Sequence, residues 1–514
     1  MAFFGNNVET TFKWLIGREV SESLLQECSK LFGEHYGIWS REGGDRAGKR
    51  VRRSPEKIQE LLNDENAGLA IALSKGQLVA YAAAVQIPVG DHEKMTWVTQ
   101  LVVHSDFRQQ GIAKRLLFAI WGFSDHFAWG LVTANPYTVR ALEKATRRRV
   151  LPYRIKEGIQ VLLSDVKGIP YITPEIEVAC DECTSRINTN FFVDHSDVPQ
   201  MVQRVSVSTP WEMGALPEGW EWLAFTFRDQ AQIELSADEV KQMIKVSDST
   251  TAIAYARMTM DKNHAWRKHI AHEVDFIWKH CNLRTGSTVL DVGCGDGRHL
   301  LELGRKDVSG TGLDYVESRI SAVNLAAKVE GLHTRFLAAD ARDIDLREEF
   351  DRVLCVYDVI GSYADDSENL RIAKTVAKHV KQGGTALISV MNLDATAFTE
   401  AQKFSIEREP DRLLHLQASR IMETSGNVFD PQFLMLDPES KVVYRREQFT
   451  EGSALPAELL VRDRRFQQHD IEEMCRLAGL TVVWSRFVRA GQWEIQLNST
   501  DHHAKEILLL CTKV

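Results

Sequence analysis

The stretch Thr288-Val-Leu-Asp-Val-Gly-Cys-Gly-Asp-Gly-Arg298 decides how the second half of this chain is read. Its apolar run predicts a short buried strand that ends at a glycine turn. Three glycines then alternate, and the residues that follow have helical spacing. Strand, glycine loop and helix in this order are typical of a doubly wound α/β sheet, which binds ligands at the carboxyl ends of its strands. Glycine serves there because a side chain would keep a ligand away from the backbone.

Two further strands expected in this half end in an acidic residue. Asp314 ends the apolar segment 310–314 and lies 17 residues after Gly297, and Asp340 ends the segment 336–340. An acid near this distance accepts ribose hydroxyl groups in nucleotide-binding folds. The pattern is not the dinucleotide fingerprint, because the third glycine comes one residue early and no pyrophosphate has to be held.

Together these segments resemble motifs I, II and III of the class I methyltransferases that use S-adenosylmethionine, and we assign residues 246–514 to such a domain. The resemblance implies that Asp291 binds the methionine end of the cofactor, directly or through water. It gives the ribose diol to Asp314 and the adenine amino group to Asp340, and the chemistry of each acid suits its role. Further cofactor contacts are expected from Gly293, Cys294, Gly295, Gly297, Tyr315, Ala341 and Tyr357, and from Tyr255 and Arg257 upstream.

The methyl acceptor is expected where the fourth strand, residues 351–359, ends. Strand ends at this edge face the ligands, so Tyr357 and Tyr363 are the candidate catalytic residues, with Asp358 beside them. Enzymes that methylate the amino groups of nucleic-acid bases usually carry Asn/Asp-Pro-Pro-Tyr/Phe at this point. This chain reads Tyr-Asp-Val-Ile-Gly, which disfavours that class. A long insertion, about 392–466, has the position and size of a substrate lid.

A second informative stretch, residues 97–117, contains Arg108-Gln-Gln-Gly-Ile-Ala113 between an apolar strand and a helix. A glycine turn at a helix N-terminus directs free N–H groups at an anion. The stretch resembles motif A of the GNAT acyltransferases, and the likeness covers residues 8–165. The resemblance implies that Arg108, Gln109, Gln110, Gly111, Ile112 and Ala113 hold the pyrophosphate of acetyl-CoA. It also implies that Leu101, Val103 and Asn135 contact the pantetheine arm.

One departure from the GNAT pattern concerns the acid for the departing thiolate. Many members place a tyrosine seven residues after the asparagine, and here that position is Leu142. Coenzyme binding is therefore better supported than catalysis. Acyl transfer to an amine still proceeds with positioning and a base reached through water, and Glu93 and His104 are the candidate bases. The alternative for both is an ordinary surface side chain.

Residues 166–245 match no motif. They are expected either to complete the acetyltransferase sheet or to form a small linking α+β domain. The pair Cys180 and Cys183 lacks the two further ligands that structural zinc needs, so no metal is expected.

The composition of the chain limits the remaining classes of protein to which it could belong. The chain has 514 residues, 44 % of them hydrophobic, and a net charge of −9. No apolar run reaches the roughly 18 residues that would span a bilayer, and no signal peptide is recognisable at the N-terminus. We therefore expect a cytoplasmic α/β protein with a GNAT-like domain, a middle segment and a Rossmann-like methyltransferase sheet.

The functional hypothesis is a bifunctional transferase that uses acetyl-CoA and S-adenosylmethionine on a small-molecule amine or a related acceptor. Two alternatives stay open. The basic clusters 41–53 and 147–149 suggest a nucleic-acid substrate, most simply RNA. Leu142 suggests a methyltransferase with a coenzyme-binding but inactive regulatory half.

Overall fold

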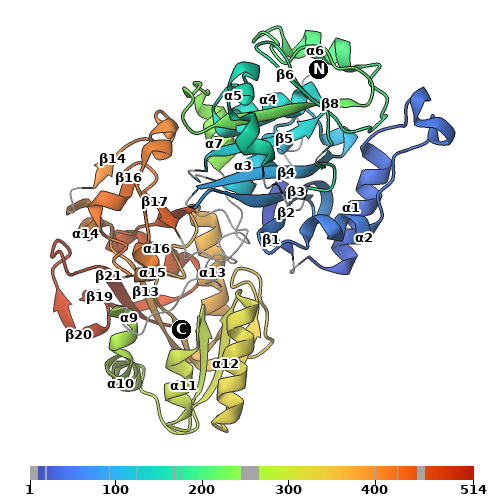
Figure 1. The fold of residues 1–514 in the computed structure, drawn as a ribbon. Helices are drawn as coiled ribbons and strands as arrows, with labels where there is room; N and C mark the ends of the chain where they lie inside the picture. Colours follow the sequence, from blue (N-terminus) through green and yellow to red (C-terminus); the bar gives the residue numbers. More distant parts are fainter. Residues whose placement is uncertain are drawn as a thin grey trace, which may run out of the picture. The chain divides into compact units, whose positions relative to one another are not determined.

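The computed structural model describes residues 10–17, 20–91, 93–122, 124, 126–164, 166, 169–173, 175–244, 265–398, 401–424, 426–448 and 458–513. The chain divides near residue 251 into two compact units, and each is built on its own eight-stranded sheet (Figure 1). Tyr255 and Arg257, two of the expected cofactor contacts, lie outside the described residues. No helix within the described ranges has the length and apolar character needed to cross a membrane.

The sheet of the first unit has the strand order β1-β2-β3-β4-β5-β8-β7-β6. Neighbouring strands are antiparallel, with the exception of the parallel pair β4 and β5. The strands are β1 (Thr10–Ile16), β2 (Ala67–Ser74), β3 (Gln77–Val89), β4 (Glu93–Val103), β5 (Ala128–Thr133), β6 (Val178–Cys180), β7 (Ser185–Asn188) and β8 (Trp220–Phe227).

Helices cover both faces of this sheet. On β1, Phe12 lies under Arg115 of α3, whose guanidinium is 3.9 Å from the ring centre, whereas Leu15 packs into the cluster formed with α1 and α2. Residues an odd number apart on a strand point to opposite faces, so α3 and the α1–α2 pair lie on different sides. The helices are α1 (Glu22–His35), α2 (Pro55–Gln59), α3 (Ile112–Trp121), α4 (Pro136–Thr146), α5 (Pro152–Leu163), α6 (Val198–Val205) and α7 (Ala237–Ile244).

The middle segment completes the first sheet, so the expectation of a separate domain over residues 166–245 is corrected. Strands β6, β7 and β8 all fall within it, and β8 pairs with β5 from Ala128↔Phe227 to Thr133↔Trp222. Without β8 the apolar strand β5 would expose an unpaired edge, which folded proteins avoid. The sequence interpretation that allowed this segment to finish the acetyltransferase sheet is the one the topology supports.

The second unit confirms the doubly wound sheet. Its order is β11-β10-β9-β12-β13-β21-β19-β20, and the first five strands are parallel. The order reverses direction between β9 and β12, which is where such sheets bind ligands. The strands are β9 (Thr288–Val292), β10 (Ser309–Asp314), β11 (Thr334–Ala338), β12 (Phe350–Cys355), β13 (Val380–Met391), β19 (Thr481–Arg489), β20 (Gln492–Leu497) and β21 (Glu506–Thr512).

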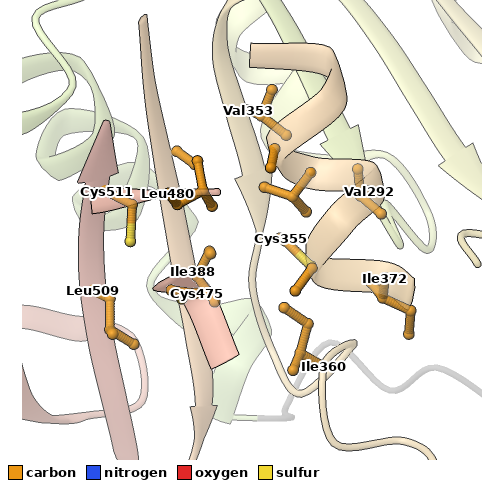
Figure 2. Packing of buried hydrophobic residues seen from close by; sticks show 14 of the residues in the cluster. Val292, Val353, Cys355, Ile360, Ile372, Ile388, Cys475, Leu480, Leu509 and Cys511 are labelled. Carbon is orange, nitrogen blue, oxygen red and sulfur yellow. The ribbon is translucent and has the colours of Figure 1, made fainter. Parts of the chain in front are cut away.

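Two apolar clusters sandwich this sheet. Leu290 and Val292 of β9 belong to the cluster beneath α13 and α16, and Val289 belongs to the other one. Figure 2 shows part of the first cluster, with Ile372 on α13 directed at the strands. The main helices are α9 (Ala265–Lys268), α10 (Ile270–His280), α11 (Arg298–Gly304), α12 (Glu317–Val329), α13 (Asp366–His379) and α16 (Gln468–Leu477).

The insertion 392–466 forms a small sheet of its own, in the order β14-β16-β17-β15 with β18 beside β17. Some of its arginines are buried: Arg445 is 2 % exposed and ion-paired with Glu447 at 2.9 Å and with Asp463. The elements are α14 (Leu393–Phe398), β14 (Gln402–Lys403), β15 (Ala418–Ser419), α15 (Ile421–Thr424), β16 (Leu434–Asp437), β17 (Val442–Gln448) and β18 (Glu458–Arg464).

The close packing between β5 and β8 predicts how substitutions there change the free energy of unfolding. A Cβ at Gly130 would lie 2.3 Å from the Phe225 ring, so Gly130→Ala should lower the free energy of unfolding by about 1–3 kcal/mol through overpacking. Gly33, in α1, has only Arg52 Cγ at 3.7 Å from the same position. Gly33→Ala should therefore be neutral or stabilise by up to about 1 kcal/mol. Urea unfolding of the full chain measures both, and equal midpoints for the two variants would contradict the packing described here.

Candidate functional site

The loop after β9 uses its three glycines for different reasons. All three have left-handed backbone angles, with φ of +78°, +57° and +71° at Gly293, Gly295 and Gly297. A Cβ at Gly293 would lie 2.3 Å from Val359, and one at Gly297 would lie 2.5 Å from Val323. A Cβ at Gly295 would meet nothing within 4 Å. The middle glycine therefore faces open space at the strand ends, where a ligand can reach the backbone.

Asp314, at the end of β10, is held beside this loop. One carboxylate oxygen accepts the Gly295 N–H at 2.9 Å, and the other accepts the Val316 N–H at 2.9 Å. Each oxygen keeps a second lone pair, so the fixed carboxylate remains able to accept two hydroxyl groups. Cys294 contributes backbone alone, because its buried thiol packs against Gly312, where a Cβ would lie 2.8 Å from the sulfur.

Asp291 is one of several side chains of this unit that bury a polar atom without a hydrogen-bond partner among the described residues. It is 1 % exposed, and its Oδ2 atom has no hydrogen-bond partner. Burial raises its pKa to about 6, although the charges of His299 and Arg298 oppose the shift. A buried carboxylate oxygen without a donor is costly, and an ammonium group would satisfy it. The residues present therefore fit the methionine end of S-adenosylmethionine.

A charged network that sequence reasoning missed lies next to Asp291. Glu273 of α10 is buried; it bonds His299 Nε2 at 2.7 Å and accepts a hydrogen bond from the Tyr357 hydroxyl. The other ring nitrogen of His299 is 3.9 Å from Asp291 Oδ2. Burial alone would raise the pKa of Glu273, but the hydrogen bond and charge of His299 and the charge of Arg298 hold it below its ordinary value. The available sequence signal was a histidine directly after the glycine loop and an acid inside an apolar helix.

The two tyrosines expected at the methyl-acceptor pocket are placed apart. The Tyr357 hydroxyl is committed to Glu273, and its ring stands 5.9 Å from that of Trp493. Tyr363 instead lies under the guanidinium of Arg342, 4.6 Å from the ring centre. The structure does not bring both phenols to one pocket, because Tyr357 has left-handed backbone angles, with φ of +63°, and turns into the core.

Asp340 and its neighbours follow β11, the strand next to β10 in the sheet. Arg342 bonds both oxygens of Asp340, at 3.0 and 2.5 Å, and also reaches Glu368 at 2.8 Å. Burial would raise the pKa of Asp340, but these bonds keep it below its ordinary value and therefore ionised. Ala341 is half-buried in the same turn, and Tyr315 is 45 % exposed after β10.

In the first unit, β4 and β5 pair over four residues and then separate. Their register runs from Met95↔Ala128 to Val98↔Leu131, although β4 continues to Val103 and β5 to Thr133. The β3–β4 register shifts at Thr99, which is a β-bulge. Leu101 and Val103 lie beyond the bulge. The edge of β4 that faces β5 there has no strand partner among the described residues, so its peptide groups are available to an extended ligand.

The loop 108–113 follows directly. Gln109 and Gly111 have φ of +60° and +76°, and the N–H groups of Gly111, Ile112 and Ala113 have no acceptor within the described part of the chain. Such alternation makes consecutive N–H groups converge into an anion-binding nest. Two side chains turn away from it. Arg108 bonds the carbonyl groups of Val103, at 3.2 Å, and His35, and Gln110 bonds that of Asp106 at 2.9 Å. The backbone, more than these side chains, is what faces the anion.

The start of α4 supplies the expected asparagine. The Oδ1 atom of Asn135 accepts the Tyr137 N–H at 2.9 Å and caps the helix, which leaves its exposed amide N–H groups free to donate. Leu142 is fully buried, so no proton donor stands where many GNAT members carry a tyrosine.

The two candidate bases lie at opposite ends of β4. At about 3.3 Å per residue, Glu93 and His104 are separated by more than about 30 Å. Glu93 forms a bidentate ion pair with Arg228, at 2.7 and 2.9 Å. His104 accepts the Asp106 N–H at 3.2 Å and stacks on His35. Both side chains serve the local fold, and neither lies at the bulge where β4 and β5 separate.

Family models match both halves of the chain. The model described as the acetyltransferase (GNAT) family matches residues 30–144, and the model described as a methyltransferase domain matches residues 289–384. The matched ranges contain the nest at 109–113 and the glycine loop at 293–297. The cofactors of these two domain families are acetyl-CoA and S-adenosylmethionine.

Individual proteins are similar to the second half. The ubiquinone biosynthesis O-methyltransferase of Rickettsia conorii is 28 % identical over 146 residues, which are 28 % of this chain and 48 % of that protein. The enzyme of the same name from Stutzerimonas stutzeri is 29 % identical over 130 residues, covering 25 % and 54 %. The chain thus spans about half the length of these relatives.

Among solved structures, an S-adenosylmethionine-dependent methyltransferase from Clostridium acetobutylicum is 15 % identical, with a TM-score of 0.33, covering 48 % of this chain and 92 % of that one. The family models and the two sheets agree: the first unit contains a domain that matches the acetyltransferase (GNAT) family model, and the second contains a domain that matches the methyltransferase model.

Proposed function

We propose that this protein is a bifunctional transferase that acetylates and methylates small-molecule acceptors, the acetyl acceptor being an amine. One observation carries the proposal. In each half, backbone groups at the carboxyl end of a parallel strand either lack a hydrogen-bond partner within the part of the chain that the structure describes or face open space. In one half this is the edge of β4 beyond Thr99, and in the other it is the open face of Gly295. A protein gains nothing from such gaps unless a ligand fills them.

In the methyltransferase half, the described residues bind and orient. When bound, S-adenosylmethionine supplies an activated methyl group, and transfer to a neutral acceptor needs chiefly alignment and exclusion of water. Asp314 fixes the ribose end and Asp291 the ammonium end. The network of Glu273 and His299 keeps Asp291 in place. The insertion 392–466 is the candidate lid over the acceptor.

A small-molecule acceptor has more support than a nucleic acid. Several of the basic residues that suggested RNA are engaged with the protein: Arg46 stacks on Trp39, Arg148 bonds the Arg228 carbonyl at 3.0 Å, and Arg149 pairs with Glu143 at 3.0 Å. The two methyltransferase relatives are named for ubiquinone biosynthesis, which is small-molecule chemistry. Their match covers about half their length, so the acceptor proposed for this chain is a class and not that molecule.

The ribose contact is tested by Asp314→Ala. The variant should bind S-adenosylmethionine about 10- to 150-fold more weakly in isothermal titration calorimetry, because lost hydrogen bonds to a charged group are worth roughly 1.5–3 kcal/mol. Asp307→Asn is the matched control, since Asp307 is an exposed acid at the far end of the same βα unit and asparagine tolerates its left-handed angle of +58°. Equal affinity in the two variants would contradict the role of Asp314.

The ammonium contact predicts a pH dependence. The pKa of Asp291 is raised from 3.8 to about 6, so the folded protein favours the protonated acid, and ionisation lowers stability above pH 6. A bound ammonium needs the ionised form. S-adenosylmethionine should therefore bind about tenfold more weakly near pH 5 than near pH 8. Asp291→Asn should bind weakly at both pH values and gain stability near pH 8. A wild-type affinity that does not change with pH would refute the contact.

The anion nest is tested by Gly111→Glu. This substitution puts a negative charge, and a side chain at an angle that favours glycine, in the turn that should hold the pyrophosphate. Acetyl-CoA binding, measured by calorimetry, should vanish. Binding of S-adenosylmethionine by the same sample should persist, which serves as the folding control because its site is in the other unit. Loss of both cofactors together would show misfolding or a single shared site.

A further inference from the structure

Two segments distant in sequence form an arch on the α1–α2 face of the first sheet. The arch consists of residues 37–53, between α1 and α2, and residues 189–194, between β7 and β8. Ser40 donates its N–H to the Phe192 carbonyl at 2.9 Å, and the Asp194 N–H donates to the Ile38 carbonyl at 2.8 Å. The apolar side chains at 191 and 193 pack into the α1–α2 cluster. The middle segment therefore helps to cover the α1–α2 face of the first sheet.

Polar side chains line the sheet beneath the arch on both sides of the bulge. Before it, Trp97 donates its indole N–H to the Tyr171 hydroxyl at 2.8 Å. After it, Gln100 accepts a hydrogen bond from the Tyr81 hydroxyl at 2.8 Å. Trp97 also contacts Phe225 of β8, with ring centres 4.8 Å apart. These contacts place the α1–α2 face of β8 next to the bulge of β4.

Glu221 reaches that face from β8. It lies four residues before Phe225, so it shares the same side of the strand, and it precedes Trp222, which pairs with Thr133 at the end of β5. The acid therefore lies level with the end of β5, where β4 and β5 have separated. Thr189 of the arch donates its hydroxyl to Glu221 at 2.9 Å and fixes the carboxylate.

Four half-buried residues from different elements of the first unit are linked by their charges: Glu221, Arg53, Tyr36 and Tyr171. Burial is the largest cause of the raised pKa of both phenols, and both also respond to the charges of Glu221 and Arg53.

The acid and the guanidinium are not paired with each other. Burial raises the pKa of Glu221 to about 7, the hydrogen bond from Thr189 opposes this, and Arg53 is not among the causes. The guanidinium of Arg53 has no hydrogen-bond or ion-pair partner among the described residues. Two opposite charges that act on the same two phenols and are not paired with each other match a ligand that carries both an ammonium group and a carboxylate.

We propose that Glu221 is the catalytic base of the acetyltransferase half, that Arg53 binds the carboxylate of the acceptor, and that the acceptor is an amino acid or a close relative of one. This inference rests on the proposed function, because it requires acetyl-CoA to lie in the gap between β4 and β5. It also assigns the role of catalytic base, which Glu93 and His104 do not fill, to a residue of the middle segment.

The chemistry balances without a further reagent. The Glu221 carboxylate accepts one proton from the ammonium group, which frees the nitrogen lone pair. The nitrogen attacks the thioester carbonyl carbon, so a C–N bond forms and the C–S bond breaks. The second proton leaves the nitrogen for the departing thiolate, and Glu221 returns its proton to solvent. A base whose pKa lies near the working pH suits this transfer.

Thiol release from acetyl-CoA tests the proposal, with the twenty standard amino acids as probes and, beside each, the amine that lacks the carboxylate. We expect wild-type protein to acetylate at least one amino acid faster than its matched amine. Glu221→Gln should lower kcat by roughly 100-fold or more with an unchanged KM for acetyl-CoA. It should also remove the rise of activity with pH near 7. Arg53→Gln should raise the KM for the amino acid and abolish the preference over the amine.

Glu218→Gln is the matched control, because Glu218 is an exposed acid three residues before Glu221; its kcat and pH profile should equal those of wild type. The urea midpoint of Glu221→Gln should not fall, since a buried acid is replaced by a neutral group of the same shape. The proposal is overturned if acetyl-CoA binds and Glu221→Gln keeps the wild-type kcat and pH profile, or if no amino acid is acetylated. Failure of wild type to bind acetyl-CoA would instead overturn the proposed function, and this inference with it.

The pH profile reports Glu221 because few other groups face it. Tyr36 from the end of α1, Tyr171 from the segment after α5 and Arg53 from the arch are its charged or titratable neighbours, and Thr189 is its hydrogen-bond donor. Both phenols have their pKa raised above the ordinary value, and a guanidinium does not deprotonate in this range. A transition near pH 7 that disappears in Glu221→Gln is therefore that of the carboxyl group.

Discussion

Backbone amide groups need hydrogen-bond partners. Both halves of this chain are organised around places where the protein itself supplies no such partner. In the first unit the bulge at Thr99 turns β4 away from β5, so one strand edge loses its neighbour inside the sheet. In the second unit left-handed glycines turn the chain directly after β9. Tightly packed segments lie near each opening, and Gly130, Gly293 and Gly297 there leave no room for a Cβ. The packing keeps the openings from collapsing, because a close-packed core cannot relax into them.

Charge is handled differently at the two sites. Around the glycine loop, the buried acids Glu273 and Asp291 share His299 between them, and removing one member of such a network leaves an uncompensated charge. Under the arch, Glu221 has a hydroxyl donor and no cation. The hydrogen-bonded pair of Glu273 and His299 holds neighbouring groups in place, whereas an acid kept without a counter-charge retains an affinity for protons and cations. The first arrangement suits binding of a cofactor, and the second suits proton transfer.

The middle segment shows how function is distributed over a fold. It carries no motif, yet it supplies the strand that closes the first sheet, half of the arch, and an acid beside the bulge. The insertion of the second unit makes a related point. Its arginines at 445, 464 and 465 are buried and paired with Asp463 or, for Arg464, with Asp366 of α13, so they stabilise the inserted sheet and its attachment to α13. Sequence position alone does not separate such residues from ligand-binding ones.

The sequence by itself determined the features that depend on a few consecutive residues. The glycine loop, the acids at the ends of β10 and β11, and the nest at 109–113 are local, because strand ends, left-handed turns and helix starts are specified by neighbouring side chains. The doubly wound sheet follows from their order along the chain. Tertiary structure alone decided that β8 joins β5, that Glu93 and His104 lie at opposite ends of a strand, and that Tyr357 turns toward Glu273. The environment of Glu221 comes from residues 36, 53, 171 and 189. Burial and charge at a site are summed over segments that only folding brings together, so no local pattern records them.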